Sequence, residues 1–94
     1  MDVSSIGYQK EPLMTVGELA EKYDEDATVV RHALKMAGKE PDGKKNRIYV
    51  YREIDGAEAL IKMYRKRAEE FKNEAQKWTG LAEKVEITYE EGWE

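Results

Sequence analysis

The sequence predicts a mainly α-helical fold with a small β-hairpin, followed by a long C-terminal helix and a short extended tail. Two short amphipathic segments lie between residues 15 and 38, and a β-branched and aromatic run follows a cluster of turn formers after residue 40. An apolar spacing of alternately four and three residues begins near residue 57. These patterns are typical of short helices, a hairpin and an extended helix. With 94 residues and no cysteine, the chain is expected to form one small domain without disulfides.

The first ordered element is expected to be a short helix that begins at Val16. Thr15 and Glu18 have the spacing of a capping box, in which each side chain accepts a hydrogen bond from the backbone of the other. Residues 1–12 show no apolar period, so we expect a flexible N-terminal arm. This arm also lacks the features of a signal peptide, and no stretch of the chain is apolar enough to span a membrane. We therefore expect a soluble, cytoplasmic protein.

A second helix is expected from Ala27 to Ala37, after a turn rich in carboxylates at positions 24–26. Asp26 is suited to cap its N-terminus, and Gly38 is a natural stop. Two short helices joined by a tight turn form a helix-turn-helix, whose second helix can enter the major groove of DNA. The apolar stripe of this second helix would be buried and consists of Val30, Ala33, Leu34 and Ala37. The polar side chains that lie largely off this stripe are Thr28, Arg31, His32 and Lys35.

A small β-hairpin is expected next, with its tip among residues 42–46, which include turn-forming Asp, Gly and Asn. Ile48 to Tyr51 has strand character. If the strand begins at Arg47, that side chain and Tyr49 share one face. The plainer alternative is that Tyr49 and Tyr51 pack beneath the hairpin. The basic side chains that crowd the tip are Lys44, Lys45 and Arg47.

A long helix is expected over residues 57–79, after a box-like start in which Asp55 precedes Glu58 by three positions. Its apolar residues follow the spacing of a coiled-coil face. Such a helix usually lies against another helix, so we expect a homodimer. The residues assigned to this dimer seam are Ile61, Tyr64, Ala68, Phe71, Ala75 and Trp78.

Residues 80–94 are expected to form an acidic tail, because Gly80 disfavours a helix by about 1 kcal/mol relative to alanine. Trp93 is too apolar for a purely solvated tail, so we expect that it either folds back onto the domain or is covered by a protein partner. Three apolar residues of the tail alternate with polar ones, as in a short strand: Val85, Ile87 and Tyr89.

The net charge of −4 conceals a basic middle between two acidic ends. Residues 1–26 carry two basic and seven acidic side chains, residues 27–67 carry eleven and five, and residues 68–94 carry three and eight. Attraction to phosphate depends on the charge close to the nucleic-acid backbone, so a basic middle suits a DNA-binding face. The plainer interpretation is a solvated surface that is locally basic.

Residues 13–67 resemble the winged helix-turn-helix domain of MerR-like DNA-binding proteins, with the winged helix-turn-helix itself at residues 13–56. The segment 16–20 reads VGELA and the segment 29–31 reads VVR, where the family has I-G-E-L-A and T-I/V-R. Residues 51–55, YREID, are similar to the tyrosine-then-acidic entry to the family's next helix. The chain is also similar to excisionases and to the DNA-recognition domains of phage terminase small subunits, which add a dimerisation helix after a like wing. The resemblance implies DNA binding, commonly as a dimer on paired half-sites.

The sequence departs from the MerR-like pattern in three places. Carboxylates at positions 24–26 lie close to the expected path of the phosphates, which is unfavourable for DNA. Tyr49 stands where a phosphate-contacting arginine is common, although Arg47 could substitute, and Gly56 interrupts an apolar helix entry. The carboxylates favour an alternative function, a protein-interaction adaptor that uses the winged-helix fold, the heptad seam and the acidic tail to bind another protein.

The function predicted from these features is non-enzymatic DNA binding by a transcriptional regulator or a phage-type excision or packaging factor. No nucleophilic cysteine, phosphate-binding glycine loop or metal-ligand spacing occurs in the sequence, so we expect no catalytic residue, cofactor or metal site. His32 also has the plainer interpretation of a polar surface residue. The residues assigned to phosphates are Arg31, Lys35, Lys44, Lys45 and Arg47. The candidates for base edges are Thr28, His32 and Asn46, and Tyr49 completes the predicted DNA-binding set.

Overall fold

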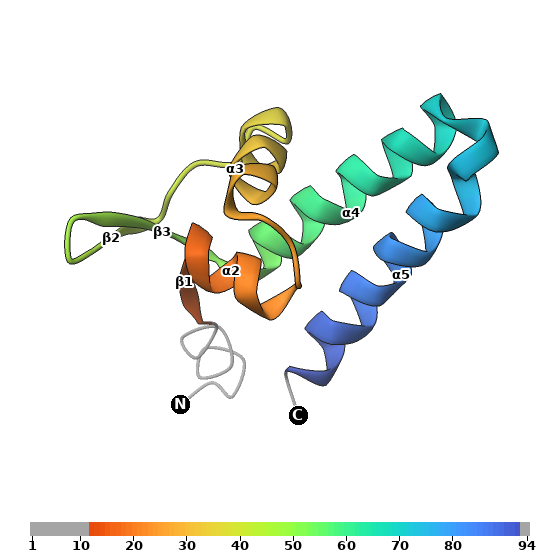
Figure 1. Ribbon diagram of the computed structural model, residues 1–94. Helices are drawn as coiled ribbons and strands as arrows, with labels where there is room; N and C mark the ends of the chain where they lie inside the picture. The colour runs from red at the N-terminus through yellow and green to blue at the C-terminus, as the bar shows by residue number, and fades with distance from the viewer. Residues whose placement is uncertain (1–11, 93–94) are drawn as a thin grey trace, which may run out of the picture.

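The computed structural model describes residues 12–92, in which two short helices precede a β-hairpin and two long helices follow it (Figure 1). This confirms the predicted mainly α-helical fold with a small hairpin. Most of the predicted arm of residues 1–12, and Trp93, lie outside the described residues. The strands are β1 (Leu13–Thr15), β2 (Gly43–Lys45) and β3 (Ile48–Arg52). The helices are α2 (Val16–Lys22), α3 (Ala27–Met36), α4 (Glu53–Glu70) and α5 (Ala75–Glu91), with a short 3-10 turn, η1 (Lys72–Glu74), between the last two.

Helices α2 and α3 begin at the residues that the sequence predicts. The capping box of α2 is formed, because the Thr15 N–H donates to Glu18 Oε1 at 2.9 Å and the Glu18 N–H donates to Thr15 Oγ1 at 3.1 Å. Asp26 occupies the N-cap of α3, but its side chain makes no capping hydrogen bond; its own N–H donates to the Glu25 carboxylate at 3.0 Å. Gly38 follows α3 with a φ of +69°, which glycine adopts without strain.

The tip of the β-hairpin lies further along the chain than predicted. Strands β2 and β3 are antiparallel, and the last pair of the ladder joins Lys45 to Ile48. Asn46 and Arg47 therefore form a two-residue turn with φ values of 52° and 70°, the positive pair that a type I′ turn requires. The predicted tip among residues 42–46 is wrong at its start, since Gly43 already belongs to β2. Arg47 lies in the turn and does not share a strand face with Tyr49.

A third strand, β1, completes the sheet in the order β1-β3-β2. It pairs antiparallel with β3, with Met14 opposite Tyr51. This strand was not predicted from the sequence, because three residues are too few to show an alternation. Its pairing attaches the start of α2 to the base of the hairpin.

The core is formed by apolar residues of all four helices, and the start of α4 anchors it to α2. Glu53 is 1% exposed, accepts a hydrogen bond from the Tyr23 hydroxyl at 2.5 Å and forms an ion pair with Lys22 at 2.6 Å. Burial and the hydrogen bond to Glu53 raise the pKa of Tyr23 well above its ordinary value. Gly56 is buried within α4, where a Cβ would stand 2.7 Å from Leu19 Cδ2. The glycine thus allows α2 and α4 to approach closely.

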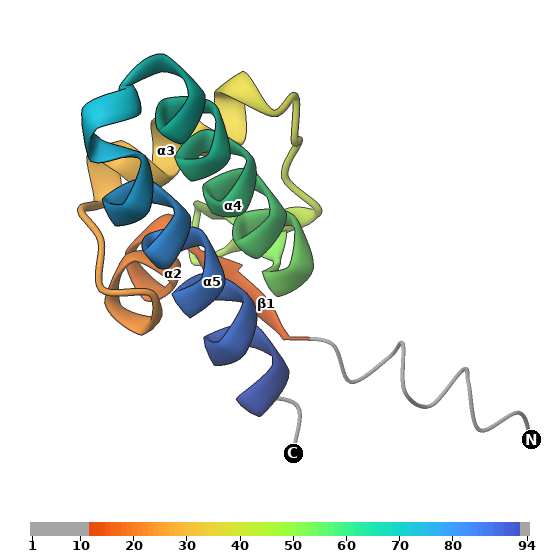
Figure 2. The same cartoon turned by 90° about the vertical axis from the view of Figure 1, so that its right-hand side faces the viewer.

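The long helix predicted over residues 57–79 is instead two helices. It begins earlier, at Glu53, and α4 ends at Glu70, where Phe71 leaves the helical conformation with φ −115° and ψ 76°. Helix α5 then runs back beside α4 as its antiparallel neighbour (Figure 2). The rings of Tyr64 and Trp78 stack with centroids 6.0 Å apart, so these two members of the predicted seam face each other within one chain. A continuous intermolecular seam is therefore wrong, because the break at Phe71 folds it in half.

The predicted acidic tail with a short strand is also wrong, since α5 continues to Glu91. Two of the three alternating apolar residues, Val85 and Tyr89, also belong to a helical stripe. With steps of four, three and four, this stripe consists of Trp78, Ala82, Val85 and Tyr89. This stripe packs on the core, and Ile87 is left 54% exposed. The short segment is compatible with the period of a strand and with that of a helix, and packing against the core selects the helix. Among the described residues, no helix combines the length and the apolar character needed to cross a bilayer.

Candidate nucleic-acid interface

Helix α3 presents four predicted site residues to solvent on one side. Val30, Ala33 and Leu34 hold the opposite side in the core, each 2% exposed or less. Within residues 12–92, neither Arg31 nor Lys35 forms an ion pair, so both charges remain available to an external anion. The exposed residues are Thr28, Arg31, His32 and Lys35, as the sequence predicts.

The β2–β3 hairpin carries the remaining predicted site residues, all of them exposed. Lys44 and Tyr49 are directly opposite on neighbouring strands, and the Lys44 Nζ lies 4.9 Å from the centre of the Tyr49 ring. Lys45 approaches Glu18 of α2 at 3.9 Å, with both side chains largely exposed, so this ion pair is weak. Arg47 projects from the turn. Tyr49 is 53% exposed, whereas Tyr51 packs partly buried against the core, so the packing alternative holds for Tyr51 alone.

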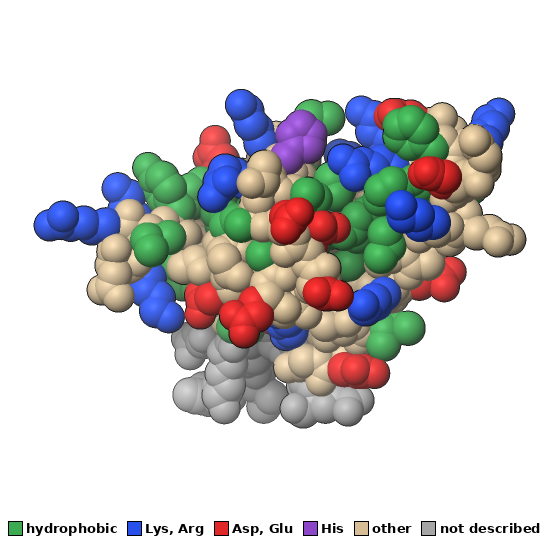
Figure 3. All heavy atoms as spheres, in the orientation of Figure 1, with side chains coloured by type: hydrophobic (Ala, Val, Ile, Leu, Met, Phe, Trp, Pro, Cys, Tyr) green, Lys and Arg blue, Asp and Glu red, His purple; other side chains and the backbone are tan. Residues whose placement is uncertain are grey.

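These two groups of side chains lie on the same face of the molecule. Figure 3 shows basic side chains around the histidine on α3 and a second basic group at the end of the hairpin. The linker between Gly38 and Gly43 connects them (Figure 1). A basic helix side and a basic hairpin end are thus visible from one side of the molecule, with apolar surface between them.

The turn before α3 introduces negative charge beside this face, as the sequence indicates. Asp24 adopts a φ of 53° and approaches Lys84 of α5 at 3.9 Å. Glu25 Oε2 accepts a hydrogen bond from the Tyr64 hydroxyl at 2.5 Å. Burial, together with that hydrogen bond, raises the pKa of Tyr64. Glu25 is therefore engaged with α4, Asp24 has only a weak contact with α5, and Asp26 remains exposed at the start of α3.

Several basic residues of the middle segment serve internal ion pairs instead of the predicted face. Lys39 lies 3.0 Å from Glu58 and 3.6 Å from Asp55, and its hydrogen bond to Glu58 raises the pKa of Lys39. Arg52 lies 3.6 Å from the same Asp55. Arg65 pairs with Glu86 across the α4–α5 hairpin. The charge count of residues 27–67 therefore overstates the charge available to a ligand, which a linear sequence does not reveal.

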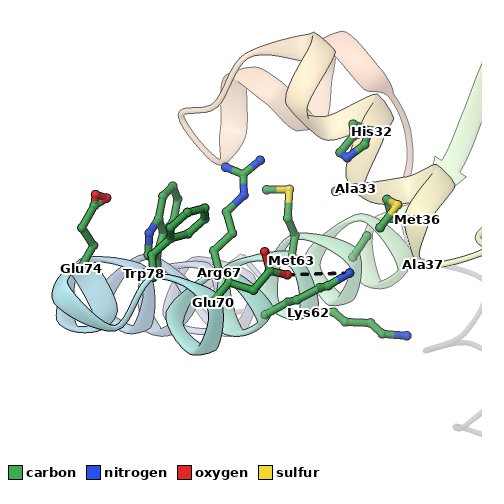
Figure 4. A pocket seen from close by; sticks show the side chains of 13 residues that line it. His32, Ala33, Met36, Ala37, Lys62, Met63, Arg67, Glu70, Glu74 and Trp78 are labelled. Atoms are coloured by element: carbon green, nitrogen blue, oxygen red, sulfur yellow. Dashed lines mark ion pairs between the residues drawn. The ribbon is translucent and has the colours of Figure 1, made fainter.

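One feature beside this face was not predicted from the sequence. A groove of about 620 Å³ lies between α3, α4 and the start of α5, and His32 is on its rim (Figure 4). Its basic residues on α4, Lys62, Lys66 and Arg67, were part of the charge count but of no predicted site. Their spacing of four and five positions along one helix was the signal that could have drawn attention to them.

Comparisons of the chain with protein-family models, with curated proteins and with solved structures found no match.

Proposed function

We propose that this protein binds double-stranded DNA, with α3 in the major groove and the β2–β3 hairpin as a wing against the phosphate backbone. The observation that carries the proposal is the gathering of α3's exposed side chains and the basic hairpin tip on one face. Helix-turn-helix proteins dock in this way, with the second helix reading base edges. The role is non-enzymatic and cytoplasmic in this proposal.

The proposed contacts divide by chemistry. Arg31, Lys35 and the three basic residues of the wing neutralise phosphates and fix the register of the protein on the duplex. Thr28, His32 and Asn46 are suited to base edges, because hydroxyl, imidazole and amide groups both donate and accept hydrogen bonds. Asn46 is at the tip of the wing with its left-handed backbone, so it would reach the duplex only with the wing docked. A regulator, an excision factor and a packaging factor would all use these contacts.

Homodimerisation stays a prediction, and the surface available for it is smaller than the sequence indicates. Tyr64 is 2% exposed within a single chain, so it has no surface to offer a second copy. Phe71, at the α4–α5 turn, is 49% exposed and is the seam residue most open to an intermolecular contact.

A titration of labelled duplex DNA with the whole chain tests the proposal. Fluorescence anisotropy with a pool of mixed 30-base-pair duplexes, at two salt concentrations, should show binding that weakens steeply as salt rises. Arg31→Ala should weaken that binding severalfold, while Lys72→Ala, which removes an exposed charge from η1, should leave it unchanged. Absence of salt-sensitive binding by the wild-type chain contradicts the proposal.

The alternative function is a protein-interaction adaptor, and the acidic turn favours it. Asp26 is exposed beside the start of α3, where a phosphate would be repelled and a basic peptide attracted. Charge reversal at this position distinguishes the two functions. Asp26→Lys should strengthen DNA binding under the proposal and should leave DNA binding absent if the protein is an adaptor alone.

A further inference from the structure

The groove between α3, α4 and α5 has an apolar floor built from small and flexible side chains. Ala33, Ala37 and Ala59 line one end. Ala33 and Ala59 are each 1% exposed, so they form the base of the groove where α3 packs on α4. Met63 rises from α4 beside them, and Trp78 of α5 closes the other end (Figure 4). Methionine adapts its shape to different apolar partners, and a groove of this composition suits a side-chain cluster from outside.

Two exposed apolar side chains extend this floor beyond the enclosed space. Met36, at the end of α3, is 56% exposed, and Phe71, at the end of α4, is 49% exposed. The groove follows α4 from Ala59 to Glu70, a helical rise of about 16.5 Å at 1.5 Å per residue. An enclosed small-molecule site would bury such residues, whereas a helix of about three turns laid along the groove would cover both.

The charges along the rim are unequal. Lys62, Lys66 and Arg67 stand on the α4 side. Lys66 reaches Glu70 only at 3.9 Å with both side chains exposed, and the Arg67 guanidinium lies 5.0 Å from the centre of the Trp78 ring. Glu70 and Glu74 supply negative charge at the end near Phe71. The groove is therefore basic along its middle and acidic at the α4–α5 turn, so a complementary occupant is acidic with a basic end.

We propose that this groove binds an acidic amphipathic helix of another protein, about three turns long. Its apolar face would lie on Trp78 and would cover Met36 and Phe71. Its carboxylates would pair with Lys62, Lys66 and Arg67. A basic residue at one end would face Glu70 and Glu74, which fixes the direction of the helix in the groove. The proposal stands apart from DNA binding, although His32 on the rim would place the partner beside the DNA-facing side of α3.

Synthetic 16-residue peptides test this site on the whole protein. One peptide carries leucines at helical spacing, glutamates beside them, one terminal lysine and alanine elsewhere to favour helix. The matched peptide has each glutamate replaced by lysine. Fluorescence anisotropy should show the acidic peptide binding about tenfold more tightly than the basic one, because several partly exposed ion pairs add to a common apolar contact. Equal binding of the two peptides, or binding of neither, overturns the proposal.

Two double variants with the same change of charge locate the contact. Lys62→Glu with Lys66→Glu, both at exposed positions of the groove rim, should remove the preference for the acidic peptide. Lys44→Glu with Arg47→Glu, on the wing, should leave that preference unchanged, and circular dichroism should show that both variants fold. A preference that disappears equally in both variants would mean that the acidic peptide is attracted to exposed basic side chains in general and not to the groove, and would overturn the proposal.

Other occupants give different results. If the groove binds a second copy of the chain, sedimentation should show a dimer that Met36→Glu dissociates, with no peptide binding. If the rim extends the DNA contact, the groove double variant should weaken DNA binding and the acidic peptide should not bind. Either result overturns the proposal.

Discussion

Basic residues of the β2–β3 hairpin and Arg65 of the α4–α5 hairpin differ in whether they form an ion pair within the chain. In the β2–β3 hairpin Lys44 and Arg47 are exposed and without ion-pair partners among residues 12–92, and Lys45 has one weak contact. In the α4–α5 hairpin Arg65 pairs with Glu86, and Tyr64 and Trp78 stack between the helices. The β-hairpin therefore leaves its basic side chains accessible, whereas in the helical hairpin Arg65 is paired within the chain and the stacked rings of Tyr64 and Trp78 stabilise the fold.

Two tyrosines, one from each hairpin, provide the sharpest test of this division between an exposed wing and a packed helical hairpin. Tyr64→Ala should lower the free energy of unfolding by about 3–5 kcal/mol, because the ring is 2% exposed and stacks on Trp78. Tyr49→Ala, at a 53% exposed ring on the wing, should change stability by less than about 0.5 kcal/mol. Urea denaturation followed by circular dichroism measures both. Similar losses in the two variants would contradict the division.

A smaller effect is expected where α2 meets α4. Tyr23→Phe removes the hydrogen bond to the buried Glu53 and should cost about 1–3 kcal/mol of stability. The pKa of Tyr23 is raised above its ordinary value of 10.0, so the folded chain keeps this proton when the unfolded chain has lost it. Stability present at neutral pH should therefore decline as the pH rises above 10.0.

Denaturation at a series of alkaline pH values tests whether stability declines in this direction. The decline should be shallower in Tyr23→Phe than in the wild type, although Tyr64, whose pKa is also raised, continues to contribute. A decline of unchanged steepness would show that Tyr23 does not keep its proton in the folded chain.

Because α2 and α4 approach closely at Gly56, adding a single methyl group there should lower the stability of the fold. Gly56→Ala places a Cβ 2.7 Å from Leu19 Cδ2, so the two helices must separate or Leu19 must change rotamer. The expected loss is about 1–2 kcal/mol, since overpacking outweighs the better helix propensity of alanine. Gly80→Ala is the matched control, because a Cβ there meets open space, and it should stabilise the chain by up to about 1 kcal/mol. Stabilisation by both substitutions would show that the α2–α4 contact is looser than described.

The smallest effect is expected at the cap of α2. Thr15→Ala removes the acceptor of the Glu18 N–H and should cost about 1 kcal/mol. The hydrogen bond from the Thr15 backbone lowers the pKa of Glu18, so its small contribution is present at neutral pH and is lost as the pH falls. Thr28→Ala, at an exposed position inside α3, is the control and should leave thermal unfolding nearly unchanged. A null result at Thr15 would show that the capping box contributes nothing to stability.

The N-terminal half could be predicted from the sequence because its signals are local. The Thr15–Glu18 capping box, the Gly38 stop and the apolar stripe of α3 each depend on residues within a few positions of one another. The exposed site residues of α3 follow directly from that stripe. The hairpin tip was displaced because Asp, Gly and Asn all favour turns, and only the strand register decides among them.

The C-terminal half was predicted less well because its structure depends on contacts between distant residues. A heptad spacing that continues through Phe71 does not reveal whether the helix is straight or folds back on itself. The contact of Tyr64 with Trp78 decides this, and it appears only in three dimensions. The groove was missed for the same reason, since its walls come from three helices. The ion pairs of Lys39 and Arg52 with Asp55 also could not be predicted from the sequence. They make these two charges less available to a ligand.

The salt dependence of DNA binding by a wing variant tests the central claim most directly. Residues Lys44 to Arg47 are all changed to alanine, and the control removes three exposed charges elsewhere, with Lys72, Lys77 and Lys84 changed to alanine. The account predicts weaker binding by the wing variant and a slope of log K against log salt that is shallower by about 0.9 for each phosphate that the wing no longer neutralises. The control should keep the wild-type slope. An unchanged affinity and slope in the wing variant, or equal losses in both variants, would contradict the account.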